Sequence, residues 1–312
     1  MLVLCLAVLV DIVLGEPPLR AHPTVWMGRL IEVWYRLGRK LTPSMQRAYG
    51  VLLTVGVVGL FAVGSYVFLQ LVARLSVPLI QIIIAAVLLK CTFSIKLMRD
   101  YASDLASALK RNDYTEARSI LRHLVRRDPS TLTNNQVISA GIETVAEGIG
   151  DGIASPLFYF ALFGVPGAFA YRAINTLDSI VGYKEPDFAN LGWFSAKLDS
   201  IVNWLPARLA SILMLIAGKL LGESASRSWR ILLRDRNRTE SWNAGWLMSA
   251  MAGLLGVRLE KPGHYALGDA DHELSYTHLN SAIRIMTFDT LLFVLVVVLI
   301  ISSMGLVINI VC

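Results

Sequence analysis

Residues 51–73 read VLLTVGVVGLFAVGSYVFLQLVA, a run of 23 residues without a charged side chain. As an α-helix this run is roughly 34 Å long, enough to cross the hydrocarbon core of a bilayer. A second uncharged run covers residues 290–311, and a third covers residues 75–89 and continues past Lys90 to about Met98. Because a helix satisfies its own backbone hydrogen bonds inside lipid, these runs predict membrane-spanning helices.

The composition of the whole chain also indicates a membrane protein. Of the 312 residues, 55% are hydrophobic and only 17% are charged, and the mean hydropathy is +0.57. Residues 1–14 form a shorter apolar run that contains Asp11 but has no basic start and no small-residue cleavage site. This pattern favours a retained membrane helix over a secretory signal peptide.

Two further apolar runs are less regular. Residues 153–171 are interrupted by Gly164-Val-Pro-Gly167, and residues 205–221 contain Arg208 and Lys219. Each run is either a span or a re-entrant half-helix, because irregular backbone is tolerated at membrane depth where it lines a protein cavity. Segment 172–204 lies outside if both runs span. It returns to the cytoplasm if both are re-entrant, and the glycine–proline break favours this second arrangement.

We therefore expect an all-α, polytopic integral membrane protein with about four to six membrane helices, of which two can be re-entrant. The whole chain, residues 1–312, is expected to form one membrane domain. A helical insertion at residues 99–150 and a loop region at residues 222–288 are expected to be cytoplasmic.

The net charge of +6 is explained by membrane topology and not by nucleic-acid binding. Of the 29 Lys and Arg residues, 21 lie in three polar segments, residues 16–50, 99–150 and 222–288. All three segments fall on one side if Met1 starts outside, and the positive-inside rule then places them in the cytoplasm. We expect a multi-pass protein of the cell membrane with its active face in the cytoplasm.

Segment 99–150 predicts three helices outside the membrane. Asp113 with Glu116 resembles an N-terminal cap for the second helix, which is expected to run to about Arg127. Thr133 with Gln136 caps the third helix in the same way.

The third helix carries the most informative acidic pattern of the chain. Glu143, Glu147 and Asp151 recur every four residues, so on a helix they form one stripe. Carboxylates at the edge of an apolar segment suit Mg²⁺, which keeps several waters and bridges substrate phosphates. The alternative is an amphipathic helix with a solvated acidic face. An apolar stripe on the opposite side comprises Ile138, Ile142, Val145 and Ile149.

The sequence lacks the familiar nucleotide-binding and hydrolase signatures: Walker A, GxGxxG after a strand, Ser-His-Asp and HExxH. Cys5, Cys91 and Cys312 lie in or beside apolar runs without CxxC spacing, which predicts buried thiols and no disulfide framework. What remains is a supply of carboxylates, amides and arginines beside the membrane. Arginine forks grip phosphate or carboxylate, but the arginines at 227–238 are also explained as a positive-inside anchor.

Several motifs follow one another along nearly the whole chain: residues 11–18 (DIVLGEPP), 22–29 (HPTVWMGR), 143–152 (ETVAEGIGDG), 156–159 (PLFY), 175–183 (NTLDSIVGY), 197–199 (KLD), 203–208 (NWLPAR), 243–246 (NAGW) and 250–257 (AMAGLLGV). Together they resemble the cobalamin-biosynthesis family CbiB/CobD, the adenosylcobinamide-phosphate synthases. The chain departs from the family pattern at Gly148, where an Asn-like residue is usual. It also departs at residues 239–248, where the family usually has His, then Ser-Pro-Asn, and Pro-Glu after the tryptophan.

The resemblance implies an ATP-dependent ligase that joins a propionate carboxylate of adenosylcobyric acid to aminopropanol phosphate or a related amino alcohol. It implies Mg²⁺ as cofactor and ATP as co-substrate. The implied partners are the corrinoid substrate, the amino alcohol phosphate, the lipid bilayer and other membrane enzymes of cobalamin assembly, with no nucleic acid.

From the chemistry of their side chains, we assign roles within this activity. Glu143, Glu147 and Asp151 are expected to hold Mg²⁺ on the ATP phosphates. Asp178 and Asn175 are expected to complete the coordination shell of this ion. Asp199 is expected to orient the incoming amine. The phosphate- and cofactor-binding set comprises Arg29, Asn175, Arg208, Arg227 and Asn243, and the set acting directly in catalysis comprises Glu147, Asp178 and Asp199.

Two other functions compete with ligation. The first is a non-catalytic membrane carrier or a structural subunit of a corrinoid assembly complex. Intramembrane Lys90, Arg208 and Lys219 would then line a path for an anionic solute. The second is a signalling or regulatory membrane protein with a related fold.

Overall fold

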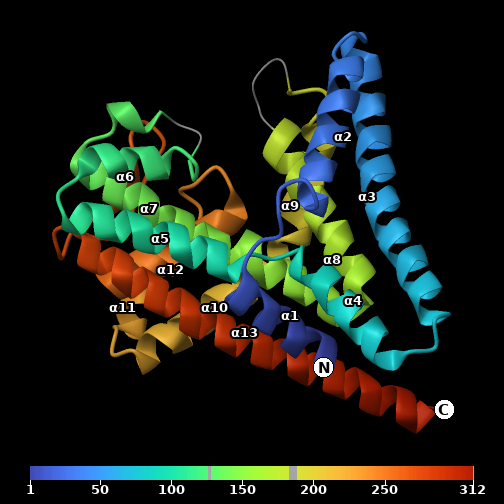
Figure 1. The fold of residues 1–312 in the computed structure, drawn as a ribbon. Helices are drawn as coiled ribbons and strands as arrows, with labels where there is room; N and C mark the ends of the chain where they lie inside the picture. Colours follow the sequence, from blue (N-terminus) through green and yellow to red (C-terminus); the bar gives the residue numbers. More distant parts are fainter. Residues whose placement is uncertain (126–127, 183–187, 312) are drawn as a thin grey trace. The chain divides into compact units, whose positions relative to one another are not determined.

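The fold is almost entirely helical in a computed structural model that describes residues 1–125, 128–182 and 188–311, with residues 304–311 described by their backbone alone. The chain divides into two compact units. The first contains residues 1–94, 155–203 and 297–312, and the second contains residues 95–154 and 204–296. Figure 1 shows the helices in sequence colours. The all-α prediction is confirmed.

The first unit is built around α3 and α8, which pack against each other. The α1 helix packs on α4, and α2 and α9 each contact both α3 and α8. The bounds of these helices are α1 (Leu2–Leu14), α2 (Pro23–Gly38), α3 (Pro43–Ala73), α4 (Pro78–Lys90), α8 (Ser155–Val181) and α9 (Trp193–Val202).

The second unit is centred on α12, which is buried along nearly its whole length and contacts α7, α10 and α11. Its helices are α5 (Ile95–Lys110), α6 (Tyr114–Leu121), α7 (Asn134–Gly148), α10 (Trp204–Leu220), α11 (Ala225–Asp235) and α12 (Trp242–Leu255). A 3₁₀ turn, η1 (Pro129–Thr131), precedes α7, and a π-helical segment, η2 (Ile149–Ala154), follows it. The last helix, α13 (Tyr276–Val311), begins in the second unit, and its residues from Val297 onward belong to the first.

A small β-hairpin in the second unit was not predicted. Strands β1 (Leu259–Lys261) and β2 (Tyr265–Leu267) pair antiparallel, with Glu260 opposite Ala266. The hairpin turns at Pro262-Gly263, where Gly263 has φ +76°. Since β1 contacts α7, the hairpin reaches the helix that carries the acidic residues.

Three helices among the described residues are long and apolar enough to cross a membrane, and they lie within Pro43–Ala73, Asn134–Val181 and Tyr276–Ser303. Two bent helix pairs, α4 with α5 and α9 with α10, raise the number to five if each pair is one span. The α1 helix is apolar but shorter. The chain is therefore a polytopic membrane protein, as predicted.

Some element boundaries differ from those predicted. The α2 helix begins at Pro23, because proline is favoured in the first turn and His22 Nδ1 accepts the Thr24 N–H. The α6 helix ends at Leu121, so its predicted extension towards Arg127 is wrong up to residue 125; residues 126–127 lie outside the described part. Both predicted caps are confirmed. Asp113 accepts from Glu116 N–H, and Thr133 and Gln136 form a capping box.

The predicted break in residues 153–171 is confirmed. Gly164 in α8 has φ +67° and ψ −161°, a backbone conformation that favours glycine. Pro166 follows within the same helix. The choice between a span and a re-entrant half-helix for this run stays a prediction, as does the side on which residues 172–204 lie.

Candidate functional site

The three acidic residues of the predicted stripe lie in different environments. Glu143 is buried on α7, Glu147 is exposed one turn later, and Asp151 is half-buried on η2. All four residues of the predicted apolar stripe, Ile138, Ile142, Val145 and Ile149, are buried. A solvated acidic face therefore does not describe Glu143.

Glu143 is held by hydroxyl groups on both of its carboxylate oxygens. Ser139 Oγ donates to Oε1 at 2.6 Å, and Tyr265 Oη donates to Oε2 at 2.9 Å. Ser139 Oγ in turn accepts the backbone N–H of Glu260 at 2.9 Å. The hairpin therefore contributes, directly or through Ser139, to the orientation of the Glu143 carboxylate. Sequence reasoning missed Ser139 and Tyr265.

Gly148 and Gly150 allow close packing around the acidic residues. A Cβ at Gly148, the position where the chain departs from the family pattern, would lie 2.4 Å from Met98 Cε. A Cβ at Gly150 would lie 2.5 Å from Leu247 Cδ1 on α12. The glycines therefore let α5 and α12 approach the segment that bears Glu147 and Asp151.

The carboxylates of Glu147 and Asp151 suit Mg²⁺ only if a phosphate ligand and waters complete its coordination. Within the described ranges, no group of three or more His, Cys, Asp or Glu side chains is placed to hold a metal ion. Mg²⁺ is ordinarily bound by one or two carboxylates plus waters and substrate phosphates, not by an all-protein cage. Glu147 and Asp151 fit that requirement as carboxylate ligands, and the metal assignment stays a prediction.

Asn175, Asp178 and Asp199 belong to the first unit, the first two on α8 and the third on α9, which packs against α8. All three are half-buried. Arg172 donates to Asn175 Oδ1 at 3.4 Å. A Cβ at Gly182 would lie 2.1 Å from Asp178 Oδ1, so only glycine permits this placement of the carboxylate.

Arg208 and Asn243, both predicted to bind phosphate or cofactor, are brought together in the second unit. Arg208 donates to Asn243 Oδ1 at 3.0 Å and to the backbone oxygen of Trp204 at 2.7 Å. Its guanidinium carbon lies 4.4 Å from the centre of the Trp204 ring and 4.8 Å from that of Trp246.

Arg227, also predicted to grip phosphate, is bound to the end of α12. Its guanidinium donates to the backbone oxygens of Gly253 and Leu254, each at 2.8 Å, and lies 3.5 Å from the Asp271 carboxylate. Gly256, with φ +64°, ends α12 beside this guanidinium. Arg227 therefore has a structural role in the described fold.

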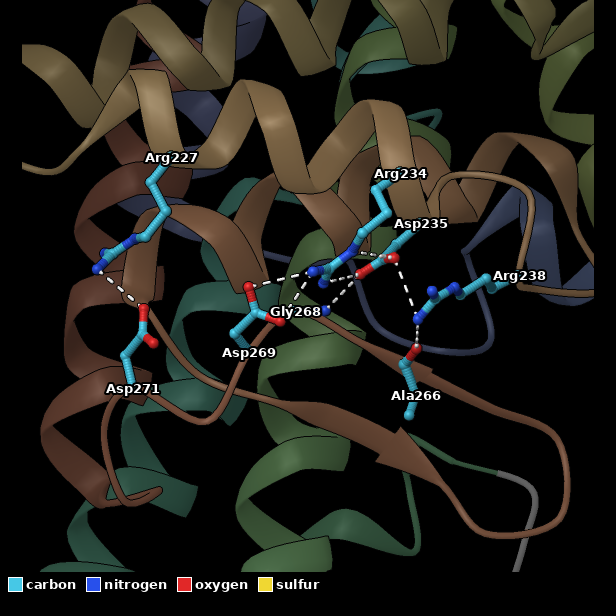
Figure 2. A network of polar contacts seen from close by, with 8 residues as sticks. All are labelled: Arg227, Arg234, Asp235, Arg238, Ala266, Gly268, Asp269 and Asp271. Carbon is cyan, nitrogen blue, oxygen red and sulfur yellow. Dashed lines mark hydrogen bonds and ion pairs between the residues drawn. The ribbon is translucent and has the colours of Figure 1, made fainter.

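A network of polar contacts around Asp235 joins α11 to the segment that follows the hairpin (Figure 2). Asp235 is fully buried and accepts two bonds from Arg234, both at 2.8 Å, and one from the backbone N–H of Gly268. Arg238 lies 3.1 Å from the same carboxylate, and Arg234 also binds Asp269 at 2.9 Å. Burial alone would raise the pKa of Asp235, but these hydrogen bonds and charges lower it below its usual value.

Arg29 is exposed on α2 in the first unit and makes no hydrogen bond or ion pair with another described residue. Tyr183, the last residue of the 175–183 motif, lies outside the described residues, as does Cys312. Of the other cysteines, Cys91 is buried as predicted, whereas Cys5 is exposed and the prediction of a buried thiol is wrong there.

The predicted site residues thus fall into two groups. Glu143, Glu147, Asp151, Arg208, Arg227 and Asn243 belong to the second unit, and Arg29, Asn175, Asp178 and Asp199 belong to the first. Their convergence on one metal and triphosphate stays a prediction.

A buried ionic cluster in the first unit was not predicted. Lys90 Nζ lies 3.0 Å from Asp11 Oδ1 and 2.7 Å from Glu16 Oε2, and both Lys90 and Asp11 are almost completely buried. His22 Nε2 contacts Glu16 Oε2 at 2.9 Å. Because Nδ1 of this ring accepts the Thr24 N–H, the proton is assigned to Nε2, which donates to Glu16.

The contacts in this cluster determine the pKa of Glu16 and neutralise the charge of Lys90. Burial would raise the pKa of Glu16, but the hydrogen bonds from His22 and Lys90 and the charge of Lys90 lower it to about 2. Lys90 is compensated by two carboxylates, so it offers little attraction to an anionic solute. This weakens the idea of a carrier path that includes Lys90.

The comparisons with known proteins agree with the motif pattern. The CobD/Cbib protein family matches residues 4–305. The chain is 43% identical over 295 residues to a probable cobalamin biosynthesis protein CobD of Methanothermobacter thermautotrophicus, covering 94% of this chain and 95% of the relative. It is 40% identical over 269 residues to the cobalamin biosynthesis protein CobD of Dehalococcoides mccartyi, covering 86% and 87%.

A third relative is the cobalamin biosynthesis protein CbiB of Salmonella typhimurium, 36% identical over 292 residues, covering 90% of this chain and 91% of the relative. No solved structure matches the chain significantly. The match over nearly the full length, in a polytopic helical membrane protein, shows that this chain belongs to the CobD/CbiB family.

Proposed function

We propose that this protein is an ATP-dependent amide ligase of cobalamin biosynthesis, acting at the cytoplasmic face of the cell membrane. It joins adenosylcobyric acid to aminopropanol phosphate, or a related amino alcohol, to give adenosylcobinamide phosphate. The observation that carries the proposal is the family match over residues 4–305, which includes the segments that bear all the predicted site residues.

The chemistry requires an activated carboxylate. A carboxylate oxygen of the corrinoid attacks the γ-phosphorus of ATP, ADP leaves, and an acyl phosphate forms. The amine then attacks the acyl carbon and loses a proton, and inorganic phosphate leaves with the original carboxylate oxygen. Phosphoryl transfer depends on positioning and on neutralising the phosphate charge. Bound Mg²⁺ would supply part of that neutralisation.

The chain's own residues supply complementary functions. Glu147 and Asp151, with Glu143 held in place by Ser139 and Tyr265, provide the carboxylate oxygens for the cation. Arg208, oriented by Asn243, provides a fork for phosphate. In the first unit, Asp178 and Asn175 are proposed to complete the shell, and Asp199 is proposed to orient the amine.

The purified protein in detergent tests the proposal. We expect ATP to be consumed only when adenosylcobyric acid and the amino alcohol phosphate are both present, and Glu147→Gln to require much more Mg²⁺ for the same rate. Consumption of ATP without either substrate, or none with both, would refute ligation. A Glu147→Gln enzyme that turns over normally at low Mg²⁺ would refute the metal assignment alone.

A further inference from the structure

Two arginines of the second unit share one tryptophan. The guanidinium carbon of Arg208, on α10, lies 4.8 Å from the centre of the Trp246 ring, and that of Arg236, at the end of α11, lies 4.9 Å from it. The two guanidinium carbons are therefore at most about 10 Å apart, a separation over which like charges still repel in a partly buried setting. Cation–π attraction to the indole offsets part of this repulsion.

Neither of these two arginines forms an ion pair with a carboxylate anywhere in the described ranges. Their neighbours in sequence behave differently. Arg234 and Arg238 both contact Asp235, and Arg227 contacts Asp271 (Figure 2). Arg236 lies between two paired arginines in the sequence but directs its charge to Trp246 instead. Among the described residues, the positive charge of Arg208 and Arg236 around this ring thus has no carboxylate counterion.

The surroundings of the pair are suited to a rigid, hydrogen-bonding anion. Asn243 is buried and accepts from Arg208, and Trp204 stacks on the same guanidinium at 4.4 Å, so the fork is held in one orientation. A planar guanidinium fixed in this way binds phosphate or carboxylate through two parallel hydrogen bonds. Two arginines match the charge of about −2 on a phosphoryl group better than the single charge of a carboxylate.

We propose that Arg208, Arg236 and Trp246 form a phosphate-binding site, with Asn243 as the positioning residue of Arg208. This proposal rests on the proposed function and adds to it. The residues of this site that bind the phosphoryl group are Arg208 and Arg236, and not Arg227, which binds the end of α12. Its ligand is a soluble phosphate compound or the phosphate of an anionic lipid headgroup, and both share the same chemistry.

The test compares four variants at three arginine positions in metal-free buffer, so that no cation site contributes. Equilibrium dialysis of labelled pyrophosphate against the detergent-solubilised protein gives the affinity. Arg236→Gln and Arg208→Gln are expected to weaken binding by about tenfold or more. Arg230→Gln removes the same charge from an exposed position on α11 and is expected to bind like the wild type. Arg236→Lys keeps the positive charge but loses the two-pronged guanidinium, so its affinity for pyrophosphate is expected to lie between those of the wild type and Arg236→Gln.

A second arm identifies the source of the phosphate. Native mass spectrometry of the protein from nanodiscs containing phosphatidylglycerol counts the retained lipids in the wild type and in Arg236→Gln. Pyrophosphate binding that depends on Arg236 assigns the site to a soluble compound. Lipid retention that depends on Arg236, without pyrophosphate binding, assigns it to a headgroup. The proposal would be overturned if pyrophosphate binding and lipid retention were both independent of Arg236, or if neither ligand bound.

Failure of this site and failure of ligation are distinguishable. If the protein binds pyrophosphate through Arg236 but never forms the amide, the proposed site stands and the proposed function is refuted. If the protein forms the amide while Arg236→Gln changes none of pyrophosphate affinity, lipid retention and KM for ATP, the proposed function stands and the proposed site is refuted. Thermal melting of each variant checks that it is folded.

Discussion

A change of charge at the buried Lys90 is expected to have a large effect on stability. Lys90→Met removes the cation that lies against the carboxylates of both Asp11 and Glu16. Removing one partner of a buried ion pair destabilises a protein by about 3–5 kcal/mol. We expect a loss of this size in the free energy of unfolding in detergent.

The exposed Lys110 on α5 supplies the matched control, because Lys110→Met removes the same charge from a surface position. Its effect should stay within about 0.5 kcal/mol. Equal effects of the two substitutions would show that the cluster around Lys90 is not formed. The triple change Lys90→Met, Asp11→Asn and Glu16→Gln should recover part of the lost stability, since it removes the three charges of the cluster together.

The lowered pKa of Glu16 predicts how the stability of the protein changes with pH. Its folded pKa of about 2 lies below the ordinary value of 4.5, so the ionised form is favoured by folding. The stability from this group is complete above pH 4.5 and is lost as the pH falls towards 2. Melting curves between pH 6 and pH 2 should therefore fall less steeply for Glu16→Gln than for the wild type. Parallel curves would contradict the assigned charge state.

The residue scale is also where the sequence was least informative. The acidic spacing of Glu143 and Glu147 pointed correctly to one helix, and the Thr133 cap located its start. The partners of Glu143 could not be found in this way, because Tyr265 lies on a hairpin far along the chain. The same applies to the ion pair of Asp11 with Lys90, since local patterns carry no information on pairing between distant segments.

At the scale of elements, the network around Asp235 is expected to hold the segment after the hairpin onto α11 (Figure 2). Asp235→Ala removes the acceptor of Gly268 N–H and leaves Arg234 and Arg238 without their shared buried partner. We expect hydrogen exchange of residues 259–271 to become faster, with little change in α3.

Asp269→Ala is the control for this prediction. Asp269 contacts Arg234 from an exposed position, and exposed ion pairs contribute little. Exchange in Asp269→Ala should therefore resemble that of the wild type. If Asp235→Ala also left the exchange of residues 259–271 unchanged, the segment would be held by other contacts.

The membrane helices were predictable from sequence, but their ends were less so. Long uncharged runs identify α3 and α13 because a helix satisfies all of its own backbone hydrogen bonds in lipid. The α3 helix nevertheless begins at Pro43, before the apolar run, because proline fits the first turn and residues 44–49 contain no proline or glycine. The hairpin was missed because strands of three residues show no clear alternation, although Pro262-Gly263 marks its turn.

At the scale of the whole molecule, we expect segment 172–204 to face the cytoplasm. Ser179 is exposed on α8, so a cysteine there reports on its side of the membrane. With Cys5, Cys91 and Cys312 replaced, an impermeant thiol reagent outside intact cells should leave Ser179→Cys unlabelled, and permeabilised cells should label it. Labelling from outside would separate Asp178 from a cytoplasmic active face and remove it from the proposed reaction.

The most direct test of ligation follows one oxygen atom. Adenosylcobyric acid labelled with ¹⁸O in the reacting carboxylate is incubated with the protein, ATP, Mg²⁺ and aminopropanol phosphate, and the released phosphate is analysed by mass spectrometry. An acyl phosphate pathway predicts one ¹⁸O in inorganic phosphate for each amide formed. Amide formation without transfer of the label, or without ATP, would contradict the account.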